Sequence, residues 1–357
     1  MKKKSLSVKK IIPRKLNFNK FLRDKKIVKI YNNFKKNFEN LINSKKIAVS
    51  VSGGADSLAL CFLVLCYKFK KNIIIQPSFY LVDHGLRSNS RYEAISVKNL
   101  LKSNKIDLKI LHWQGKKPNS NLQNLARKKR YELIFKECEK SNIGTVITGH
   151  HKADLYETFF SRLLRGSGTE GLSSFSKIEK NFNYKNYKIR VLRPLLNLNK
   201  QDLVYISKRV FKFYVKDPSN EQDKFQRARI RKLISNLTKE GLNFKKLNLT
   251  INNLASTTKA MNEVVDYNIK ENVTYHLKKK YLINSKFFLM PDEVVFRSLS
   301  ILLKNITHKD YPPRGKKIIN MIKDLKNKQY IKATLGGTII EKIHNSVVVS
   351  KEKTKKH

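Results

Sequence analysis

The sequence predicts an α/β protein in which a parallel sheet covered by helices is followed by a helical segment and a small C-terminal α+β domain. From about residue 40 to 236, short apolar strands alternate with helices through brief connections, which is typical of a parallel sheet covered on both faces. Asp83, His84 and His150 stand at predicted carboxyl ends of strands, where such sheets bind ligands. The 357 residues, 40% of them hydrophobic, are enough for two or three domains.

The individual elements are expected in a regular order. Apolar strands are expected at 47–51, 78–82, 108–113 and 145–148. The helices after them are an apolar one from Leu58, one opened by a capping box of Ser90 and Glu93, a basic one over 121–142 and one over 153–165. The later elements are a hairpin over 181–193, a helix over 200–210, a turn at 217–220, a helix that begins at Arg227, and a strand over 346–350.

The turn between the first strand and the apolar helix is the most informative stretch. It reads Ser52-Gly53-Gly54-Ala55-Asp56-Ser57. Glycines let the backbone turn sharply and approach a ligand closely, and the free N–H groups of the next helix then face an anion. The turn lacks the Gly-Lys-Ser/Thr ending of a Walker A loop. The alternative interpretation is an ordinary strand-to-helix turn that contains two glycines.

A second group of polar residues follows the strand expected at 145–148. His150, Asp154 and Glu157 have i, i+4, i+7 spacing, so they lie on one face if the helix includes them. Two carboxylates there can bind a cation, either Mg²⁺, which favours carboxylate and phosphate oxygens, or the ammonium group of a substrate. Zinc is disfavoured because carboxylates suit harder ions. The alternative is a solvated helix edge with incidental charges.

Two groups of arginines are candidate phosphate ligands. Arg127 and Arg130 lie on the basic helix beside Tyr131, and an arginine can bind phosphate through two parallel hydrogen bonds. The second group alternates along the chain rather than following one helical face, and it comprises Arg227, Arg229 and Arg231. Because these three arginines do not share one helical face, they can contact different partners. For both groups, the alternative is plain surface charge.

Composition indicates the class of partner. The net charge is +49, and so large an excess predicts a polyanion such as nucleic acid, because clustered cations release counterions from phosphates. The alternative is a solvated basic surface. The three cysteines have neither paired nor zinc spacing, which favours a reducing compartment. No stretch is long and apolar enough for a membrane span or signal peptide, so we expect a cytoplasmic protein without membrane contact. Monomer and homodimer both remain open.

The turn at 52–57 resembles the Ser-Gly-Gly-x-Asp-Ser signature of the PP-loop ATP pyrophosphatases, which cleave ATP between the α- and β-phosphates. Further motifs over about residues 45–235 narrow the resemblance to the tRNA(Ile)-lysidine synthase family. They lie at 82–87, 126–131, 150–158, 162–168, 193–195 and 217–220. The Leu335-Gly336-Gly337 stretch resembles the C-terminal part of some members, more weakly.

The resemblance implies an enzyme that uses ATP and Mg²⁺ to adenylate the C2 carbonyl oxygen of the wobble cytidine in the isoleucine tRNA with a CAU anticodon. The amine of free L-lysine then displaces AMP and leaves lysidine. This changes codon reading from AUG to AUA and charging identity from methionine to isoleucine. Lysine must lose a proton before it attacks, and a nearby carboxylate or histidine is the candidate base.

The same resemblance implies roles for individual residues. The ATP-binding residues are Ser52, Gly53, Gly54, Ala55, Asp56 and Ser57. The catalytic residues are Asp56, Arg130 and His150, and Asp56 also helps to hold the metal. Asp154 and Glu157 receive the ammonium groups of lysine. The tRNA-binding residues are Arg193, Arg227, Arg229 and Arg231.

Four segments are expected along the chain. They are a basic flexible arm at 1–22, a PP-loop ATP pyrophosphatase catalytic domain at 23–236, a helical connector at 237–285 and a C-terminal tRNA-contacting domain at 286–357.

The sequence departs from the family pattern at three positions. Ala153 stands where members usually carry Asp, Leu155 where they carry Gln, and Ala228 where Asn is common. The lost carboxylate at 153 puts metal binding by that helix in doubt. Three rival functions share some of these features. A tRNA thiolase needs a cysteine pair or an iron–sulfur cluster, an amidotransferase-type synthetase fits the +49 charge badly, and a non-catalytic RNA-binding protein would bind tRNA without releasing pyrophosphate.

Overall fold

The structure is a computed structural model that describes residues 16–71, 75–115, 122–175, 178–215, 226–276, 280–309 and 311–352. The chain divides into two compact units, one up to Ile251 and one from Asn252 onward. The turn expected at 217–220 and residues 1–15 of the expected arm lie outside the described ranges.

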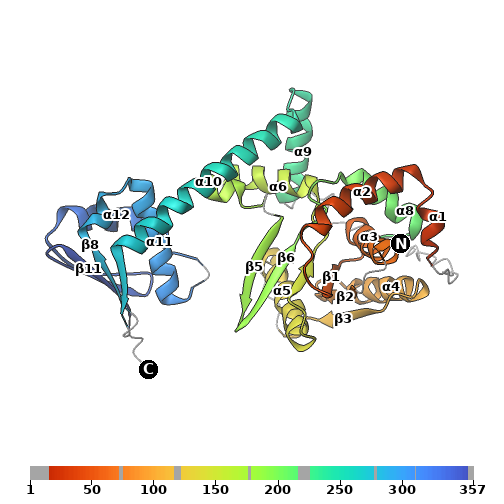
Figure 1. The fold of residues 1–357 in the computed structure, drawn as a ribbon, viewed down its shortest axis with the longest axis horizontal. Helices are drawn as coiled ribbons and strands as arrows, with labels where there is room; N and C mark the ends of the chain where they lie inside the picture. Colours follow the sequence, from red (N-terminus) through yellow and green to blue (C-terminus); the bar gives the residue numbers. More distant parts are fainter. Residues whose placement is uncertain are drawn as a thin grey trace, which may run out of the picture. The chain divides into compact units, whose positions relative to one another are not determined.

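A six-stranded sheet forms the centre of the first unit, in the order β3-β2-β1-β4-β6-β5 (Figure 1). Neighbouring strands are parallel except at one edge, where β5 and β6 form the expected antiparallel hairpin. The strands are β1 (Lys46–Val51), β2 (Gln76–Asp83), β3 (Leu108–His112), β4 (Thr145–Ile147), β5 (Glu179–Tyr184) and β6 (Tyr187–Leu192). The sequence therefore predicted the parallel sheet correctly.

Helices cover both faces of this sheet (Figure 1). The helices that begin in the first unit are α1 (Phe18–Phe21), α2 (Lys25–Glu39), α3 (Ala55–Lys71), α4 (Ser90–Ser103), α5 (Leu122–Lys140), α6 (Lys152–Leu163), α7 (Thr169–Ser173), α8 (Lys200–Val210), α9 (Gln226–Lys239) and α10 (Phe244–Asn272). Side chains alternate across a strand, so Val49 packs into the core shared with α2, α3, α4 and α8, while Ala48 packs into the core shared with α5.

The candidate site lies where the order of the strands reverses. From β1 the chain proceeds outward to β2 and β3, whereas β4 pairs with the other side of β1. In open α/β sheets, this switch point leaves a crevice beyond the carboxyl ends of the two central strands. The turn at 52–57 follows β1, and Thr148, Gly149 and His150 follow β4. Two distant parts of the sequence therefore meet at one edge of the sheet.

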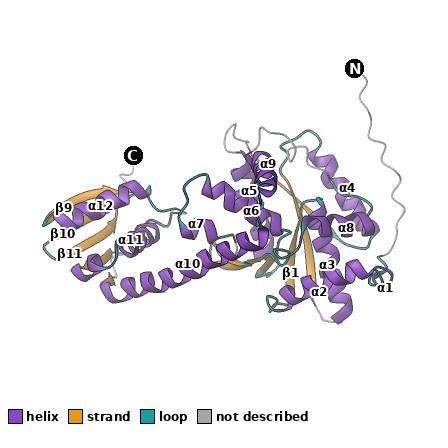
Figure 2. Ribbon diagram, turned by 90° about the horizontal axis from the view of Figure 1, so that it is seen from above, coloured by secondary structure: helices purple, strands orange, loops and turns teal. Residues whose placement is uncertain are grey.

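The second unit is a five-stranded antiparallel sheet in the order β7-β8-β11-β10-β9, with two helices packed against it (Figure 2). Its elements are β7 (Val273–His276), β8 (Lys280–Asn284), a 3₁₀ turn (Ser285–Leu289), α11 (Asp292–Thr307), α12 (Gly315–Asn327), β9 (Tyr330–Leu335), β10 (Thr338–Ile343) and β11 (Ser346–Lys351). Val347 and Val349 of β11 and Leu299 of α11 share its core.

Three local expectations differ from the structure. The helical segment ends at Asn272, and the connector expected at 237–285 contains β7 and β8, because β-branched and aromatic residues there join the sheet, β7 pairing with β8 and β8 with β11. The division between the units falls inside α10 rather than near residue 236. Residues 16–22 of the expected arm are packed: Phe18 stacks on Phe62.

The capping box expected at Ser90 and Glu93 was wrong. Asn89 is the N-cap of α4 and makes no side-chain capping bond. The Ser90 hydroxyl instead bonds to Asp83, and Glu93 pairs with Arg87 at 3.2 Å. Long-range and loop partners therefore outcompete the local cap.

Candidate active site

The turn at 52–57 is held together by one hydroxyl. The Ser57 Oγ atom accepts from the Ser52 amide at 3.1 Å and from the Ser52 hydroxyl at 3.2 Å, and it donates to the Gly54 carbonyl at 3.0 Å. Gly53 has φ +78°, and a Cβ atom there would lie 2.6 Å from Val97. Ser57, expected to bind ATP, thus shapes the loop, and only glycine fits at position 53.

Two neighbouring elements clamp the start of α3. A Cβ atom on Gly149 would lie 3.3 Å from the backbone of Asp56 and Ser57, so the absence of a side chain lets the end of β4 approach the loop. On α8, the buried Ser207 hydroxyl donates to the Ala55 carbonyl at 2.6 Å. The loop is therefore positioned by close contacts from two other segments of the chain.

A pocket of about 120 Å³ opens over the loop. It is lined by Ser50, Ser52, Asp56, Ser57, Arg130, Tyr131, Thr148, Gly149 and His150. The structure thus brings together the three residues expected to be catalytic, Asp56, Arg130 and His150, although they come from α3, α5 and the end of β4.

One side of the site is strongly cationic, and we call it the arginine half: His150 with Arg127, Arg130, Arg193 and Arg227. Arg127 lies 3.4 Å from His150 Nε2, and the buried Arg193 guanidinium lies 4.2 Å from the centre of the Phe175 ring. Burial lowers the pKa of His150 well below its ordinary value, and the positive charges of the four arginines lower it further. Crowded cations of this kind favour an anionic ligand.

The other side is anionic, and we call it the carboxylate half: His151 with Asp56, Asp154 and Glu157. The His151 side chain is 4% exposed, and its Nε2 atom lies 3.4 Å from Asp56 and 3.6 Å from Asp154. Burial opposes a charge on His151, but the hydrogen bond to Asp56 and the charges of Asp154 and Asp56 raise its pKa overall. His151 thus connects the turn at 52–57 to α6.

The side chains of His150 and His151 have different surroundings because α6 begins at Lys152, immediately after them. His151 is the N-cap of α6, with extended backbone angles, and its Nδ1 atom accepts from the Ala153 amide at 3.2 Å. Asp154 closes the cap by accepting from the His151 amide at 2.9 Å. His150 therefore precedes the helix, so the helical face expected to carry it carries only Asp154 and Glu157.

The arginines of α9 have separate environments. Arg231 bonds to the buried Glu157 through Nε at 2.6 Å and through a terminal nitrogen at 3.3 Å. The sequence had placed Arg231 on tRNA and Glu157 on lysine, and it did not suggest that the two form an ion pair. Arg227 contributes its charge to the arginine half, and Arg229 is exposed. The alternating pattern accordingly distributes these side chains among different surroundings.

Asp56 is the residue best suited to hold a metal with ATP. Its Oδ1 atom is buried and has no hydrogen-bond partner. Among the described residues no three His, Cys, Asp or Glu side chains converge into a metal site. Mg²⁺ commonly takes only one or two protein carboxylates and completes its shell with substrate phosphates and water. The donor set therefore fits Mg²⁺ that arrives with ATP.

The cysteines are buried in the two cores of the first unit, Cys61 and Cys66 in one and Cys138 in the other. Burial raises the pKa of all three thiols, and that of Cys138 reaches about 12. A buried thiol with a raised pKa is a poor nucleophile.

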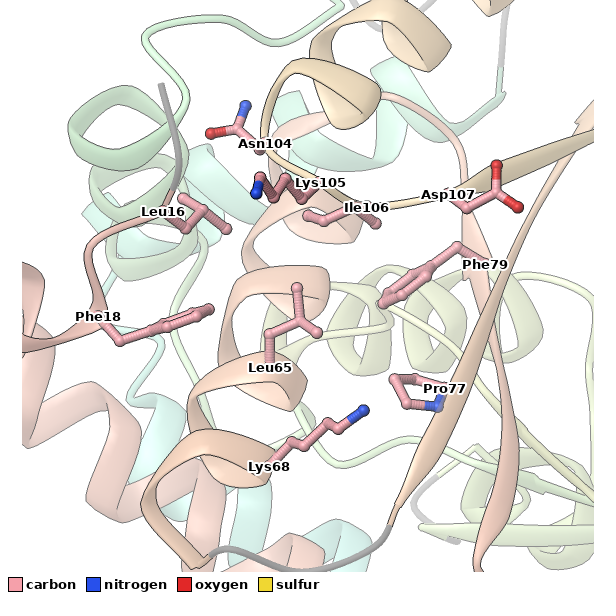
Figure 3. A pocket seen from close by; sticks show the side chains of 10 residues that line it. All are labelled: Leu16, Phe18, Leu65, Lys68, Pro77, Phe79, Asn104, Lys105, Ile106 and Asp107. Atoms are coloured by element: carbon pink, nitrogen blue, oxygen red, sulfur yellow. The ribbon is translucent and has the colours of Figure 1, made fainter. Parts of the chain in front are cut away.

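A second, larger pocket of about 290 Å³ lies away from the loop (Figure 3). Pro77 near the start of β2 and Asp107 just before β3 line it, so it is at the opposite end of these strands from the turn at 52–57. Lys68 lies at one edge of the pocket with its ammonium group directed toward Pro77, and Leu65 and Phe79 are among the apolar side chains that line it (Figure 3). The polar groups expected to act on a nucleotide all lie at the other pocket.

The described helices include none long and apolar enough to cross a membrane.

Comparisons with known proteins agree with this geometry. The PP-loop domain family matches residues 24–238. A tRNA(Ile)-lysidine synthase from Orientia tsutsugamushi (strain Boryong) is 34% identical over 329 residues, which cover 86% of this chain and 70% of that protein. One from Wolbachia pipientis wMel is 30% identical, covering 89% and 74%, and one from Rickettsia akari (strain Hartford) is 32% identical, covering 92% and 75%.

Among solved structures, the chain is similar to a U34-tRNA thiolase from Methanococcus maripaludis described with its 4Fe-4S cluster. The TM-score is 0.54 and the identity 17%, over 66% of this chain and 79% of that chain. At this identity the likeness shows the fold alone.

Proposed function

Because the chain belongs to the tRNA(Ile)-lysidine synthase family, a family of ligases built on a PP-loop domain, we propose that it joins L-lysine to C2 of the wobble cytidine in CAU-anticodon isoleucine tRNA. ATP is consumed, the intermediate is an adenylated cytidine, and the products are lysidine, AMP and pyrophosphate. The observation that carries this proposal is the division of one site beside the PP-loop into an arginine half and a carboxylate half.

In the first step, the C2 carbonyl oxygen of cytidine attacks the α-phosphate, and the bond to pyrophosphate breaks. The amides of Gly53 and Gly54, just before the start of α3, suit the departing phosphates, while the Ser52 amide is used within the loop by Ser57. Arg130 and the other members of the arginine half stabilise the negative charge that develops on them. Asp56 would hold Mg²⁺, which offsets phosphate charge when bound.

In the second step, the lysine amine attacks C2, the C2–oxygen bond breaks, and AMP leaves. A cationic amino acid suits the carboxylate half, where Asp154 and Glu157 share one face of α6. Glu157 already binds Arg231, so Asp154 is the carboxylate with more capacity for an incoming ammonium group. The carboxylate half orients the amino acid, and the arginine half holds AMP as it departs.

The second unit is proposed to contact tRNA outside the anticodon. Arg314, Lys316 and Lys317 are exposed at the start of α12, and cations of this kind bind phosphates in a salt-dependent way. The double variant Lys316→Gln/Lys317→Gln should weaken full-length tRNA binding and lower its salt dependence, while activity on an isolated anticodon stem-loop stays unchanged. Unchanged affinity for full-length tRNA would contradict this contact.

The decisive experiment measures pyrophosphate release from ATP with CAU-anticodon isoleucine tRNA, with and without L-lysine. Release that depends on this tRNA, together with lysine incorporation, supports the proposal. Methionine tRNA with the same anticodon is the matched control and should give neither. Release without lysine incorporation would indicate another nucleophile, and tight binding without release would favour a non-catalytic RNA-binding protein.

A further inference from the structure

Thr148 is a buried residue at the mouth of the site whose hydroxyl faces His150. It follows β4, it is 5% exposed, and its Oγ1 atom lies 2.9 Å from His150 Nδ1. The same hydroxyl lies 3.3 Å from the Leu192 carbonyl, which also accepts from the Thr148 amide at 3.0 Å. The hydroxyl thus stands between a backbone acceptor and the imidazole ring.

The partners of His150 decide where its ring proton lies. A guanidinium group can only donate hydrogen bonds, so His150 Nε2, at 3.4 Å from Arg127, must accept. In a neutral ring the proton is then on Nδ1, which donates to Thr148 Oγ1. Thr148 in turn donates its own proton to Leu192. In the other tautomer, the N–H groups of Arg127 and His150 would point at each other.

We propose that Thr148 is a positioning residue that holds His150 in the Nδ1-protonated tautomer, so that Nε2 keeps its lone pair and orients Arg127 within the arginine half. The proposal rests on the proposed function for its kinetic consequence, but not for the tautomer itself.

The chemical advantage is a neutral acceptor among cations. A protonated His150 would add a positive charge beside Arg127 and Arg193 and would offer them no lone pair. The Nδ1-protonated ring adds no charge, and it holds Arg127, which also donates to the Tyr131 hydroxyl at 3.3 Å. Arg127 is then oriented before the nucleotide arrives, which removes an ordering cost from the phosphate-transfer step.

The test combines nuclear magnetic resonance of ¹⁵N-histidine in the full chain with kinetics. His150→Gln assigns the His150 signals by their loss. The wild type should carry its ring proton on Nδ1, and Thr148→Val should shift the population toward the Nε2-protonated form. Thr148→Val should slow tRNA-dependent pyrophosphate release about 10- to 100-fold without changing the KM for lysine. Thr148→Ser keeps the hydroxyl and should restore both readouts.

Thr145→Val is the matched control, because it removes a buried hydroxyl from β4, the strand that Thr148 follows, without touching His150. It should leave the tautomer and the rate near wild type. In a His150→Gln background, Thr148→Val should cause no further loss. A wild-type ring protonated on Nε2 would overturn the proposal, as would a slow Thr148→Val enzyme with an unchanged tautomer. If the wild type released no pyrophosphate, the proposed function would fail while the tautomer assignment stayed testable.

Discussion

The arginine half and the carboxylate half contain two adjacent histidines, His150 and His151, yet the charges that surround these two side chains are opposite. The pKa of His150 is lowered by burial and by four arginines, whereas the pKa of His151 is raised by Asp56 and Asp154. One site can therefore receive an anion on one side and a cation on the other. The proposed ligation would use this separation, because ATP and lysine carry opposite charges and would have to meet at one cytidine.

The separation arises from backbone geometry. His151 is extended, and successive side chains of an extended chain point to opposite sides. The N-cap bond to Ala153 then fixes His151 at the start of α6, among the carboxylates. His150 is left beside α5 and its arginines. Two adjacent residues therefore connect the arginine half to the carboxylate half, and the arginines and the carboxylates remain on separate sides of the site.

The largest expected effect comes from removing one cation of the arginine half. Arg130→Gln should slow tRNA-dependent pyrophosphate release by roughly 10²- to 10³-fold, because a half-buried donor proposed to bind the phosphates is lost. The KM for lysine should stay near wild type, since the carboxylate half is untouched. Lys136→Gln removes the same charge from an exposed position of α5 and serves as control. A loss confined to lysine binding would show that the halves are assigned the wrong way round.

A smaller effect is expected from the matching change in the carboxylate half. Asp154→Asn keeps an acceptor for the His151 amide but removes the charge, so the KM for lysine should rise by about 100-fold. Pyrophosphate release without lysine should change by less than about threefold, by the same separation of sites. Asp107→Asn, exposed at the opposite end of the sheet, is the control. Equal losses in both steps would mean that Asp154 acts on the nucleotide.

The sequence predicted the parts of this comparison that depend on local patterns. The order of strand, loop and helix located the turn at 52–57 and the segment that carries Asp154. The alternation of strands and helices along the chain predicted the fold class. It could not reveal that Ser207 holds the loop, because that contact joins residues 152 positions apart. The pair between Arg231 and Glu157 spans 74 positions and was equally invisible. The only sequence signal for the role of His151 is its place before a helix that has no Ser, Thr, Asp or Asn at the N-cap.

Breaking the ion pair between Glu157 and Arg231 tests whether the Arg231 cation stabilises the buried carboxylate. Arg231→Met should lower the free energy of unfolding by about 2–4 kcal/mol, because the Glu157 side chain, 6% exposed, would be left charged and unpaired. Denaturant unfolding measures this change. The double variant Glu157→Gln/Arg231→Met should recover much of the loss, since it buries no lone charge. A single variant as stable as the wild type would show that water or another cation already satisfies Glu157.

The smallest effect concerns the pH dependence of stability in the arginine half. His150 has a lowered pKa in the folded protein, so between that value and about 6.5 the unfolded chain binds more protons. Its contribution to stability is therefore present above about pH 6.5 and is lost as the pH falls. The groups that face it from neighbouring elements, Arg127, Arg130, Arg193 and Arg227, stay charged throughout this range.

His150→Gln should consequently flatten the fall in stability on the acid side. The difference in unfolding free energy between about pH 7.5 and 5.5 should shrink by roughly 1 kcal/mol relative to the wild type. Denaturant titrations at several pH values measure it, with His308→Gln, an exposed histidine of the second unit, as control. If the His150 variant lost stability more steeply than the wild type in acid, His150 would have to be charged in the folded protein. The arginine half would then lack the neutral acceptor on which its contrast with the carboxylate half depends.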